Sequence, residues 1–239
     1  FNTSSDLNGH PVGNLLLAAL CNITGNISDG ITSLSKVLNL KGKVLPLSED
    51  NVILMGVMSD NKIVEGEHNI TQYKKEIKDI YYKEDPKINP EVIDAINKSD
   101  MIILSMGSLY TSIICNLLSD EVKNAIDNSK AKILYVCNMF TQPGETDNFT
   151  VSDHIKAINN HLGKRKINTV IVNDGKIPKK YILKYHREEE KTPVLIDKEN
   201  ISKLNVKIIK DNFVKLEDNS LKHEAVKLSL KIFEELIKH

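Results

Sequence analysis

The order of apolar and polar residues predicts that strands and helices alternate regularly after residue 90. Short apolar runs are separated by longer segments in which apolar residues recur with the period of a helix. The expected elements are a helix at 90–98, strand 101–105, helix 108–118 continuing to 128, strand 132–137, helix 152–162, strand 168–172 and helix 178–187. Strands that alternate with helices pair in parallel, because the helical crossover returns each strand in the same direction.

The flanking segments follow other patterns. Helices are predicted at 11–22 and 29–38, followed by a β-hairpin excursion at 44–82 around the turn Ser59-Asp60-Asn61. The expected strands of the excursion are 44–47, 52–58 and 63–68, with 77–82 as their extension. After Pro193 the expected elements are strands 194–196 and 206–209 and a closing helix 222–237, with Ala225, Leu228, Leu230, Phe233 and Ile237 near one face.

Length and composition are consistent with one large α/β domain. The chain has 239 residues, of which 41% are hydrophobic, enough for a full core. No linker rich in Pro, Gly or Ser interrupts it, and no repeats are visible. We therefore expect 1–239 to be a single α/β domain with a mainly parallel sheet, and the hairpin excursion 44–82 to lie within it.

Charge and cysteine content narrow the class of partners. Lys plus Arg and Asp plus Glu are both 32, so the formal net charge is zero and no overall field attracts a nucleic acid. The longest apolar runs, such as 13–21, are shorter than the roughly 20 residues that cross a bilayer, so no membrane association is expected. Cys21, Cys115 and Cys137 are odd in number and lie in apolar segments, which is typical of reduced thiols in a cytoplasmic protein.

A candidate anion site lies where the strand at 101–105 gives way to a helix. Free backbone N–H groups and the positive end of a helix dipole meet at such a start, and hydroxyl side chains add further donors. The residues that would form this site are Gly107, Ser108, Leu109, Tyr110 and Thr111. The simpler interpretation is a favourable turn with a helix cap and no ligand.

A second turn, at 138–147, follows the strand at 132–137 and, like the first, leads from a strand into a helix. Pro143-Gly144 favours a tight turn, and the polar density exceeds what a plain connection needs. The candidate ligand-binding residues are Asn138, Thr141, Gln142, Glu145 and Thr146. Alternatively, Glu145 and Asp147 are solvated loop charges, and Ser152 is a simple helix cap paired with Asp153.

The segment Gly9-His10-Pro11-Val12-Gly13-Asn14 offers a third helix start of this kind. Gly9 and Gly13 allow close approach of a ligand to the backbone, while His10 and Asn14 project polar groups. A histidine in the position of His10 is more often a cap or turn residue than a catalytic base. Ligands of open parallel sheets bind outside the carboxyl ends of the strands, so the turns at 105–111 and 138–146 are expected to open onto one crevice.

Five ordered motifs carry a resemblance to a known family. They are GHPVGNLLLAAL at 9–20, DGITSLSKVLNLKGKVLPLS at 29–48, GSLYTSII at 107–114, YVCNMFTQPGETDNFTVSDHI at 135–155 and VIVNDGKIP at 170–178. In these motifs the chain resembles the family that contains the bacterial gluconeogenesis factor and the 2-phospho-L-lactate transferase of deazaflavin coenzyme synthesis. The run CNMFTQPGETD is the most specific signal, and the gluconeogenesis-factor branch is the better fit.

The resemblance implies a Rossmann-like three-layer α/β fold, a cytoplasmic protein and a nucleotide or nucleotide-sugar ligand. For the gluconeogenesis-factor branch it implies binding of UDP-sugars such as UDP-N-acetylglucosamine and a regulatory role that links carbon metabolism to cell shape and wall synthesis. For the transferase branch it implies transfer of a phospholactyl group from a nucleotide-activated donor to a deazaflavin with Mg²⁺. We expect binding without turnover, so no catalytic residue, metal ligand or other cofactor is assigned, and a homodimer is the expected assembly.

Near the carboxyl end, Lys222-His223-Glu224 stands where the family often has Arg-His-Asp, with Tyr185 in a preceding helix. The resemblance implies that Lys222 and Tyr185 reach the ligand; the alternatives are a solvated lysine and a partly buried aromatic residue. The chain also departs from the family, because it begins at Phe1, already near the GHPVGN motif, without the family's glycine-rich loop and acidic segment. We therefore expect the first glycine-rich βα unit to be missing.

Overall fold

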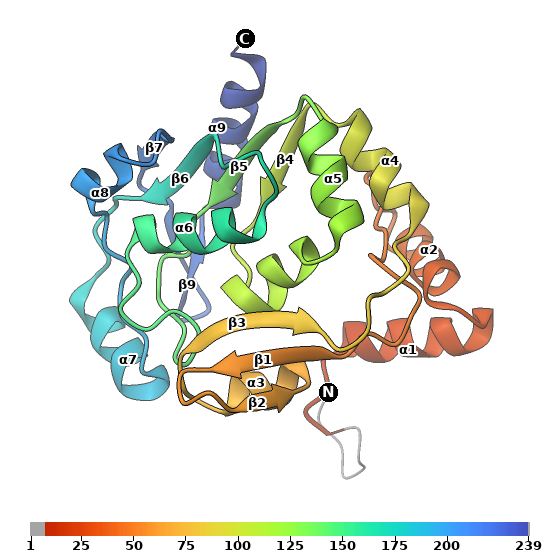
Figure 1. Cartoon of the computed structure of the whole chain (residues 1–239). Helices are drawn as coiled ribbons and strands as arrows, with labels where there is room; N and C mark the ends of the chain where they lie inside the picture. Colours follow the sequence, from red (N-terminus) through yellow and green to blue (C-terminus); the bar gives the residue numbers. More distant parts are fainter. Residues whose placement is uncertain (1–7, 239) are drawn as a thin grey trace. The chain divides into compact units, whose positions relative to one another are not determined.

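The computed structural model describes residues 8–238, so the expectation about a missing segment at Phe1 falls outside the described residues. The chain divides into two compact units, one made of 1–52 with 86–95 and the other of 53–85 with 96–239 (Figure 1).

The first unit is built around a pair of helices, α1 (Val12–Thr24) and α2 (Ile27–Val37). Asn26 starts α2, because its side-chain oxygen accepts the N–H of Asp29 at 2.8 Å. The two helices pack closely where a β-carbon on Gly30 would lie 2.5 Å from the sulfur of Cys21. The strand expected at 44–47 does not form, because Pro46 has no N–H to donate, and the nearest pairing is the isolated bridge Ser48 to Ile88. Helix α4 (Pro90–Lys98) begins in this unit.

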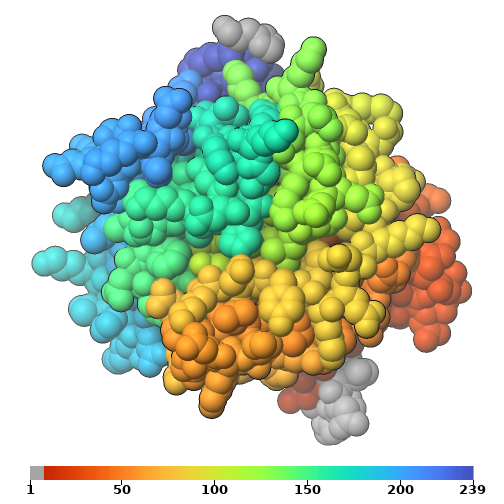
Figure 2. Space-filling model, viewed as in Figure 1, coloured from red at the N-terminus to blue at the C-terminus, as the bar shows by residue number. Residues whose placement is uncertain are grey.

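The second unit contains the parallel sheet predicted from the alternating pattern. Its strand order is β4-β5-β6-β7, with every neighbouring pair parallel. The strands are β4 (Met101–Leu104), β5 (Lys132–Val136), β6 (Thr169–Asn173) and β7 (Lys207–Asp211). Helices α5 (Asp120–Asn128) and α6 (Val151–His161) cover one face, and α9 (Ala225–Ile237) covers the other (Figure 1). In the space-filling view from the same side, α5 and α6 lie next to each other on the surface (Figure 2).

Alternation along β5 explains how the three layers hold together. Leu134 and Val136 point toward α9 and pack with Leu228 in a buried cluster. Tyr135 points to the opposite face, where its ring stacks on His154 of α6 at 6.5 Å between ring centres. The expected Rossmann-like three-layer α/β fold with a mainly parallel sheet is therefore confirmed.

The hairpin excursion is also present, as an antiparallel sheet of order β2-β1-β3. Its strands are β1 (Leu54–Met58), β2 (Ile63–Glu65) and β3 (Ile77–Tyr82). The strand expected to reach residue 68 stops at Glu65, because Gly66 has a φ of 88° and helix α3 (Glu67–Gln72) begins directly after it. Ile70 of α3 packs on the sheet, where a β-carbon on Gly56 would lie 3.0 Å from it.

The single helix expected from 108 to 128 is three pieces. A π-helical turn η1 (Leu109–Ile113) is followed by a 3₁₀ turn η2 (Ile114–Leu117), and α5 starts afresh after Ser119. The N–H of Ile113 donates to the Ser108 carbonyl, five residues back, at 3.0 Å. Ser119 then caps α5 by accepting the N–H of Glu121 at 3.2 Å. Such π turns are frequent next to functional sites.

The region after β6 differs most from the prediction. Helix α7 (Lys179–Glu189) agrees with the helix expected at 178–187. The pattern did not indicate α8 (Lys198–Ser202) or the hairpin of β8 (Val214–Glu217) and β9 (Ser220–His223). The segment 194–196 is not a strand, because β7 takes the place beside β6. Leu195 instead accepts the N–H of Val151 at 3.0 Å and ties the loop to the start of α6.

The closing helix also differs from its expected start and face. Lys222 and His223 belong to β9, and α9 begins only at Ala225. Leu228 and Ile232 face the sheet, whereas Leu230, Phe233 and Ile237 are exposed. The reason is Glu235, which is buried because it accepts hydrogen bonds from Lys207 at 2.6 Å and Thr169 at 3.1 Å and so fixes the rotation of the helix.

Candidate functional site

The two candidate turns lie side by side at the carboxyl edge of β4 and β5, as expected. The amide nitrogen of Asn138 donates to the carbonyl of Gly107 at 3.0 Å, and the amide nitrogen of Gln142 donates to the hydroxyl of Ser108 at 2.7 Å. A hollow of about 250 Å³, here called the polar crevice, lies beside these two bonds. It is lined by Met106, Gly107, Ser108, Asn138, Met139, Phe140, Thr141, Gln142, Lys191 and His223.

The helix start after Ser108 already holds an anion, and that anion belongs to the protein. The N–H of Tyr110 and the hydroxyl of Thr111 both donate at 3.1 Å to the carboxylate of Glu145, which is 2% exposed. A helix start favours a negative charge, and a buried carboxylate from the neighbouring turn satisfies it. Tyr110, Thr111 and Glu145 therefore dock the two turns together behind the polar crevice, and Leu109 is fully buried beside them.

Thr141 and Thr146 shape the second turn from within. Thr141 donates its N–H to the carbonyl of Thr192 at 2.8 Å, and its hydroxyl accepts the N–H of Thr192 at 3.0 Å. The hydroxyl of Thr146 accepts the N–H of Gln142 at 2.8 Å. Both side chains are 2% exposed, and their hydroxyls form hydrogen bonds that stabilise the turn. Thr141 also lines the polar crevice.

The interpretation of Ser152 as a helix cap paired with Asp153 is wrong. The residue that starts α6 is Thr150, whose N–H donates to the carboxylate of Asp153 at 3.1 Å. Ser152 is fully buried, and its hydroxyl donates to Asp197 at 2.6 Å. This bond joins α6 to the residue that precedes α8.

Tyr185 and Lys222 do not line the polar crevice. The hydroxyl of Tyr185 accepts the N–H of Leu221 at 3.0 Å, and its ring lies 4.9 Å from that of Phe140, so Tyr185 supports a crevice residue from behind. Lys222 is exposed on β9 and pairs with Glu217 at 3.3 Å.

Five residues that line the polar crevice were not among the candidates from the sequence: Met106, Met139 and Phe140, and the two basic residues Lys191 and His223. His223 lines it, and burial lowers the pKa of this histidine, which favours the neutral ring. The motif Lys222-His223-Glu224 indicated this place, and of its residues His223 is the one that lines the polar crevice. Lys191 also lines the polar crevice and pairs with Glu189 at 2.6 Å; no pattern in the sequence distinguishes it from the other lysines.

The third candidate segment belongs to the first unit. Gly9, His10, Gly13 and Asn14 are exposed around the start of α1. Gly9 has a φ of 82°, which glycine adopts without strain, and the N–H of Asn14 donates to the carbonyl of Pro11 at 3.1 Å. The expectation that this segment binds the ligand stays a prediction.

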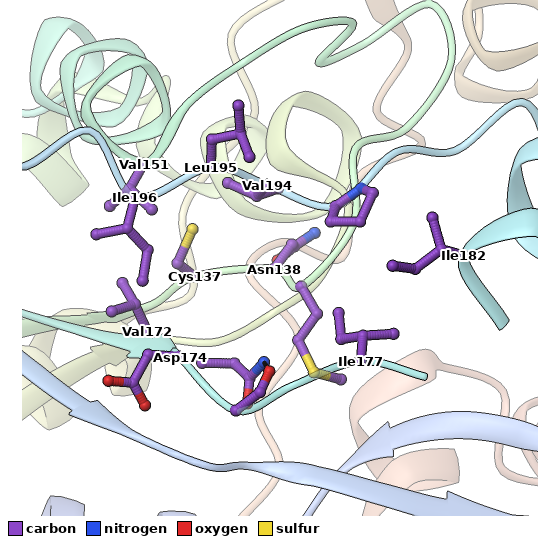
Figure 3. Close-up of a pocket in the computed structure, with 14 residues that line it drawn as sticks. Cys137, Asn138, Val151, Val172, Asp174, Ile177, Ile182, Val194, Leu195 and Ile196 are labelled. Atoms are coloured by element: carbon purple, nitrogen blue, oxygen red, sulfur yellow. Dashed lines mark hydrogen bonds between the residues drawn. The ribbon is translucent and has the colours of Figure 1, made fainter. Parts of the chain in front are cut away.

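Figure 3 shows a second hollow, here called the apolar cavity. Its volume is about 350 Å³, and Asn138 and Met139 line both hollows. The other lining residues are Cys137, Val151, Val172, Asn173, Asp174, Gly175, Ile177, Ile182, Pro193, Val194, Leu195 and Ile196. Burial raises the pKa of Cys137 to about 12, so this thiol stays protonated at neutral pH.

Two oxygen atoms between these turns lack hydrogen-bond partners. The side-chain oxygens of Asn138 and Gln142 are buried, and no donor within residues 8–238 reaches them. An unpaired buried acceptor costs about 1–3 kcal/mol, so such atoms stand out in a folded protein.

Neither a metal site nor a membrane span is found in the described part of the chain. Residues 8–238 contain no group of three or more His, Cys, Asp or Glu side chains that could hold a metal ion. Among the same residues, no helix is long and apolar enough to cross a bilayer.

A parallel sheet with helices on both faces and a crevice outside the carboxyl ends of β4 and β5 defines a Rossmann-like α/β protein, a class in which this edge of the sheet is the usual place for ligands. The chain belongs to the 2-phospho-L-lactate transferase CofD family, whose model matches residues 1–214.

Similar proteins come from several bacteria. The chain is 41% identical over 232 residues to the gluconeogenesis factor of Bacillus subtilis (strain 168), covering 96% of this chain and 72% of that protein. It is 42% identical over 235 residues to the gluconeogenesis factor of Halalkalibacterium halodurans, covering 98% and 73%. The crystal structure of a Bacillus halodurans protein superposes with a TM-score of 0.90 at 42% identity, covering 96% of this chain and 74% of that one.

Proposed function

We propose that this protein is a cytoplasmic regulatory protein of central carbon metabolism, cell shape and cell wall synthesis that binds a nucleotide sugar of the UDP-N-acetylglucosamine type. Support comes from the two gluconeogenesis factors that are 41% and 42% identical over nearly the whole chain. The observation that carries the proposal is the polar crevice, which the Asn138–Gly107 and Gln142–Ser108 hydrogen bonds place between two strand ends.

The two adjoining hollows suit a ligand with two chemically different parts. A nucleotide sugar of this type has a flat base, whose faces pack against apolar side chains, and hydroxyl-rich sugars, joined through a charged diphosphate. The polar crevice and the apolar cavity have volumes of about 250 and 350 Å³ and share Asn138 and Met139. Ligand sites commonly occupy about 300–1,000 Å³, so one such molecule could occupy both hollows.

In this proposal the predicted site residues have two kinds of role. Gly107, Ser108, Asn138, Thr141 and Gln142 line the polar crevice and would contact the ligand. A second group holds those walls from behind: Leu109, Tyr110, Thr111, Glu145, Thr146 and Tyr185. For Lys222, and for Gly9, His10, Gly13 and Asn14, ligand contact remains an expectation from the sequence.

The alternative function is transfer of a phospholactyl group from a nucleotide-activated donor to a deazaflavin. The observation that favours it is the match of the transferase family model to residues 1–214. Such an enzyme would be a transferase of phosphorus-containing groups and would depend on Mg²⁺.

Titration calorimetry separates the two functions. We expect UDP-N-acetylglucosamine to bind without Mg²⁺, whereas binding of GDP that requires Mg²⁺ would support the transferase instead. Replacing Asn138 by Ala should weaken UDP-N-acetylglucosamine binding by about 1–3 kcal/mol, because a wall hydrogen bond and an acceptor are both lost. The matched control is Asn160→Ala, since Asn160 is exposed on α6 and lines neither hollow. No binding of either nucleotide, or equal losses in both variants, would refute the proposal.

A further inference from the structure

We infer that the wall formed by Asn138 and Gln142 binds an uncharged, hydrogen-bond-donating part of the ligand, such as sugar hydroxyls or an amide N–H, and not its phosphates. This inference rests on the proposed function and assigns the chemistry of one wall of the same site. It reverses the simplest expectation for a glycine-containing turn after a parallel strand, which is an anion site.

The orientation of the Asn138 amide is set by its neighbour. Its nitrogen donates to the carbonyl oxygen of Gly107 at 3.0 Å, and a carbonyl can only accept. If the amide were turned over, two oxygen atoms would face each other and repel. The Asn138 oxygen is therefore the atom left without a partner, and it can be satisfied only by a donor.

Gln142 repeats this arrangement on the same wall. Its nitrogen donates to the hydroxyl of Ser108 at 2.7 Å, which leaves its oxygen unpaired beside the polar crevice. Because a hydroxyl can donate as well as accept, the orientation of the Gln142 amide is less strictly fixed than that of Asn138. Both oxygens are covered in the free protein, and ligand entry would move the covering side chains, an adjustment common on binding.

The charges around the polar crevice also favour an uncharged ligand group at this wall over a phosphate. Of its lining residues only Lys191 and His223 are basic, and Lys191 already pairs with Glu189 at 2.6 Å. The nearby helix start is occupied by the Glu145 carboxylate, which would repel a second anion placed against Tyr110 or Thr111. The wall thus contains two unpaired acceptors and little positive charge.

Replacing Gln142 by Glu tests this assignment. The Ser108 hydroxyl can donate to the new carboxylate, so the link between the turns survives while an acceptor of full negative charge faces the polar crevice. If hydroxyl or N–H groups bind here, UDP-N-acetylglucosamine should bind Gln142→Glu within about fivefold of the wild type, whereas Gln142→Leu should bind at least tenfold more weakly. Gln72→Glu on the exposed face of α3 is the matched control for the change in net charge.

The outcomes distinguish this inference from the proposed function. A loss of thirtyfold or more in Gln142→Glu, with Gln72→Glu unchanged, would place phosphate at this wall and overturn the inference, while the proposed function stands. Binding of inorganic pyrophosphate that Gln142→Glu abolishes would overturn it whichever nucleotide binds. A wild-type protein that binds neither UDP-N-acetylglucosamine nor GDP overturns both.

A second measurement uses the wild-type protein alone and does not depend on how the variants fold. In nuclear magnetic resonance spectra, the side-chain NH₂ signals of Asn138 and Gln142 should move when saturating UDP-N-acetylglucosamine is added, because a hydrogen bond accepted by the amide oxygen polarises the amide group. Unchanged signals at saturation would overturn the inference.

Discussion

Replacing the buried Glu145 tests whether its hydrogen bonds to Tyr110 and Thr111 hold together the two turns that form the crevice. The Glu145→Gln substitution preserves the shape of the side chain but removes its charge. In the wild-type protein this carboxylate accepts the N–H of Tyr110 and the hydroxyl of Thr111, both at 3.1 Å. The glutamine oxygen can keep the first bond, and its nitrogen can donate to the threonine oxygen, so the variant should fold with two neutral hydrogen bonds in place of two charge-assisted ones.

The size of the effect follows from these bonds. A hydrogen bond to a charged group contributes about 1.5–3 kcal/mol and a neutral one about 0.5–1.5 kcal/mol, so the two replacements together lose about 2 kcal/mol. The substitution also removes the cost of burying a charge, because Glu145 is 2% exposed, and this works in the other direction. We expect a net loss of about 1–2 kcal/mol, which lowers the melting temperature of a protein of this size by about 2–8 °C.

Calorimetric melting of the wild type and Glu145→Gln measures this loss. The matched control is Glu188→Gln, because Glu188 is exposed and pairs with Arg187 at the surface, at 3.1 Å; the stability of this variant should differ from that of the wild type by less than about 0.5 kcal/mol. A melting temperature of Glu145→Gln equal to or above that of the wild type would show that the helix start does not depend on an anion, and the account of the docked turns would be wrong.

Two further predictions concern buried groups near the site. Thr141→Val should lower stability by about 1–3 kcal/mol in urea unfolding, because the N–H of Thr192 loses its acceptor, whereas Thr71→Val on the exposed face of α3 should have little effect; equal effects would contradict the role given to Thr141. Burial lowers the pKa of His154 from 6.5, so its contribution to stability is full above pH 6.5 and is lost as the pH falls, by up to about 1.4 kcal/mol per pH unit. The unfolding free energy of His154→Gln should therefore fall less steeply than that of the wild type between about pH 6.5 and pH 5, and parallel pH profiles would refute the assignment.

The sequence by itself determined the architecture and the location of the two turns. The alternation of apolar runs with helical segments after residue 90 is a local property, and it placed β4, β5 and β6 within one residue of their observed limits. Parallel pairing then brings the strand ends to one edge, so the meeting of the turns at 107–108 and 138–142 could be anticipated. The ordered motifs were sufficient to indicate the family.

Only the tertiary structure decided which polar groups are free at that edge. Glu145 could be read as a solvated loop charge or a ligand contact, and it proved to be the anion of the neighbouring helix start because the two turns face each other across 35 residues of sequence. Thr141 is paired with Thr192, and His223 reaches the crevice through a hairpin absent from the apolar pattern. Hydrogen bonds between residues far apart in the chain leave no periodic signal, so composition and pattern locate the site while packing assigns the role of each side chain.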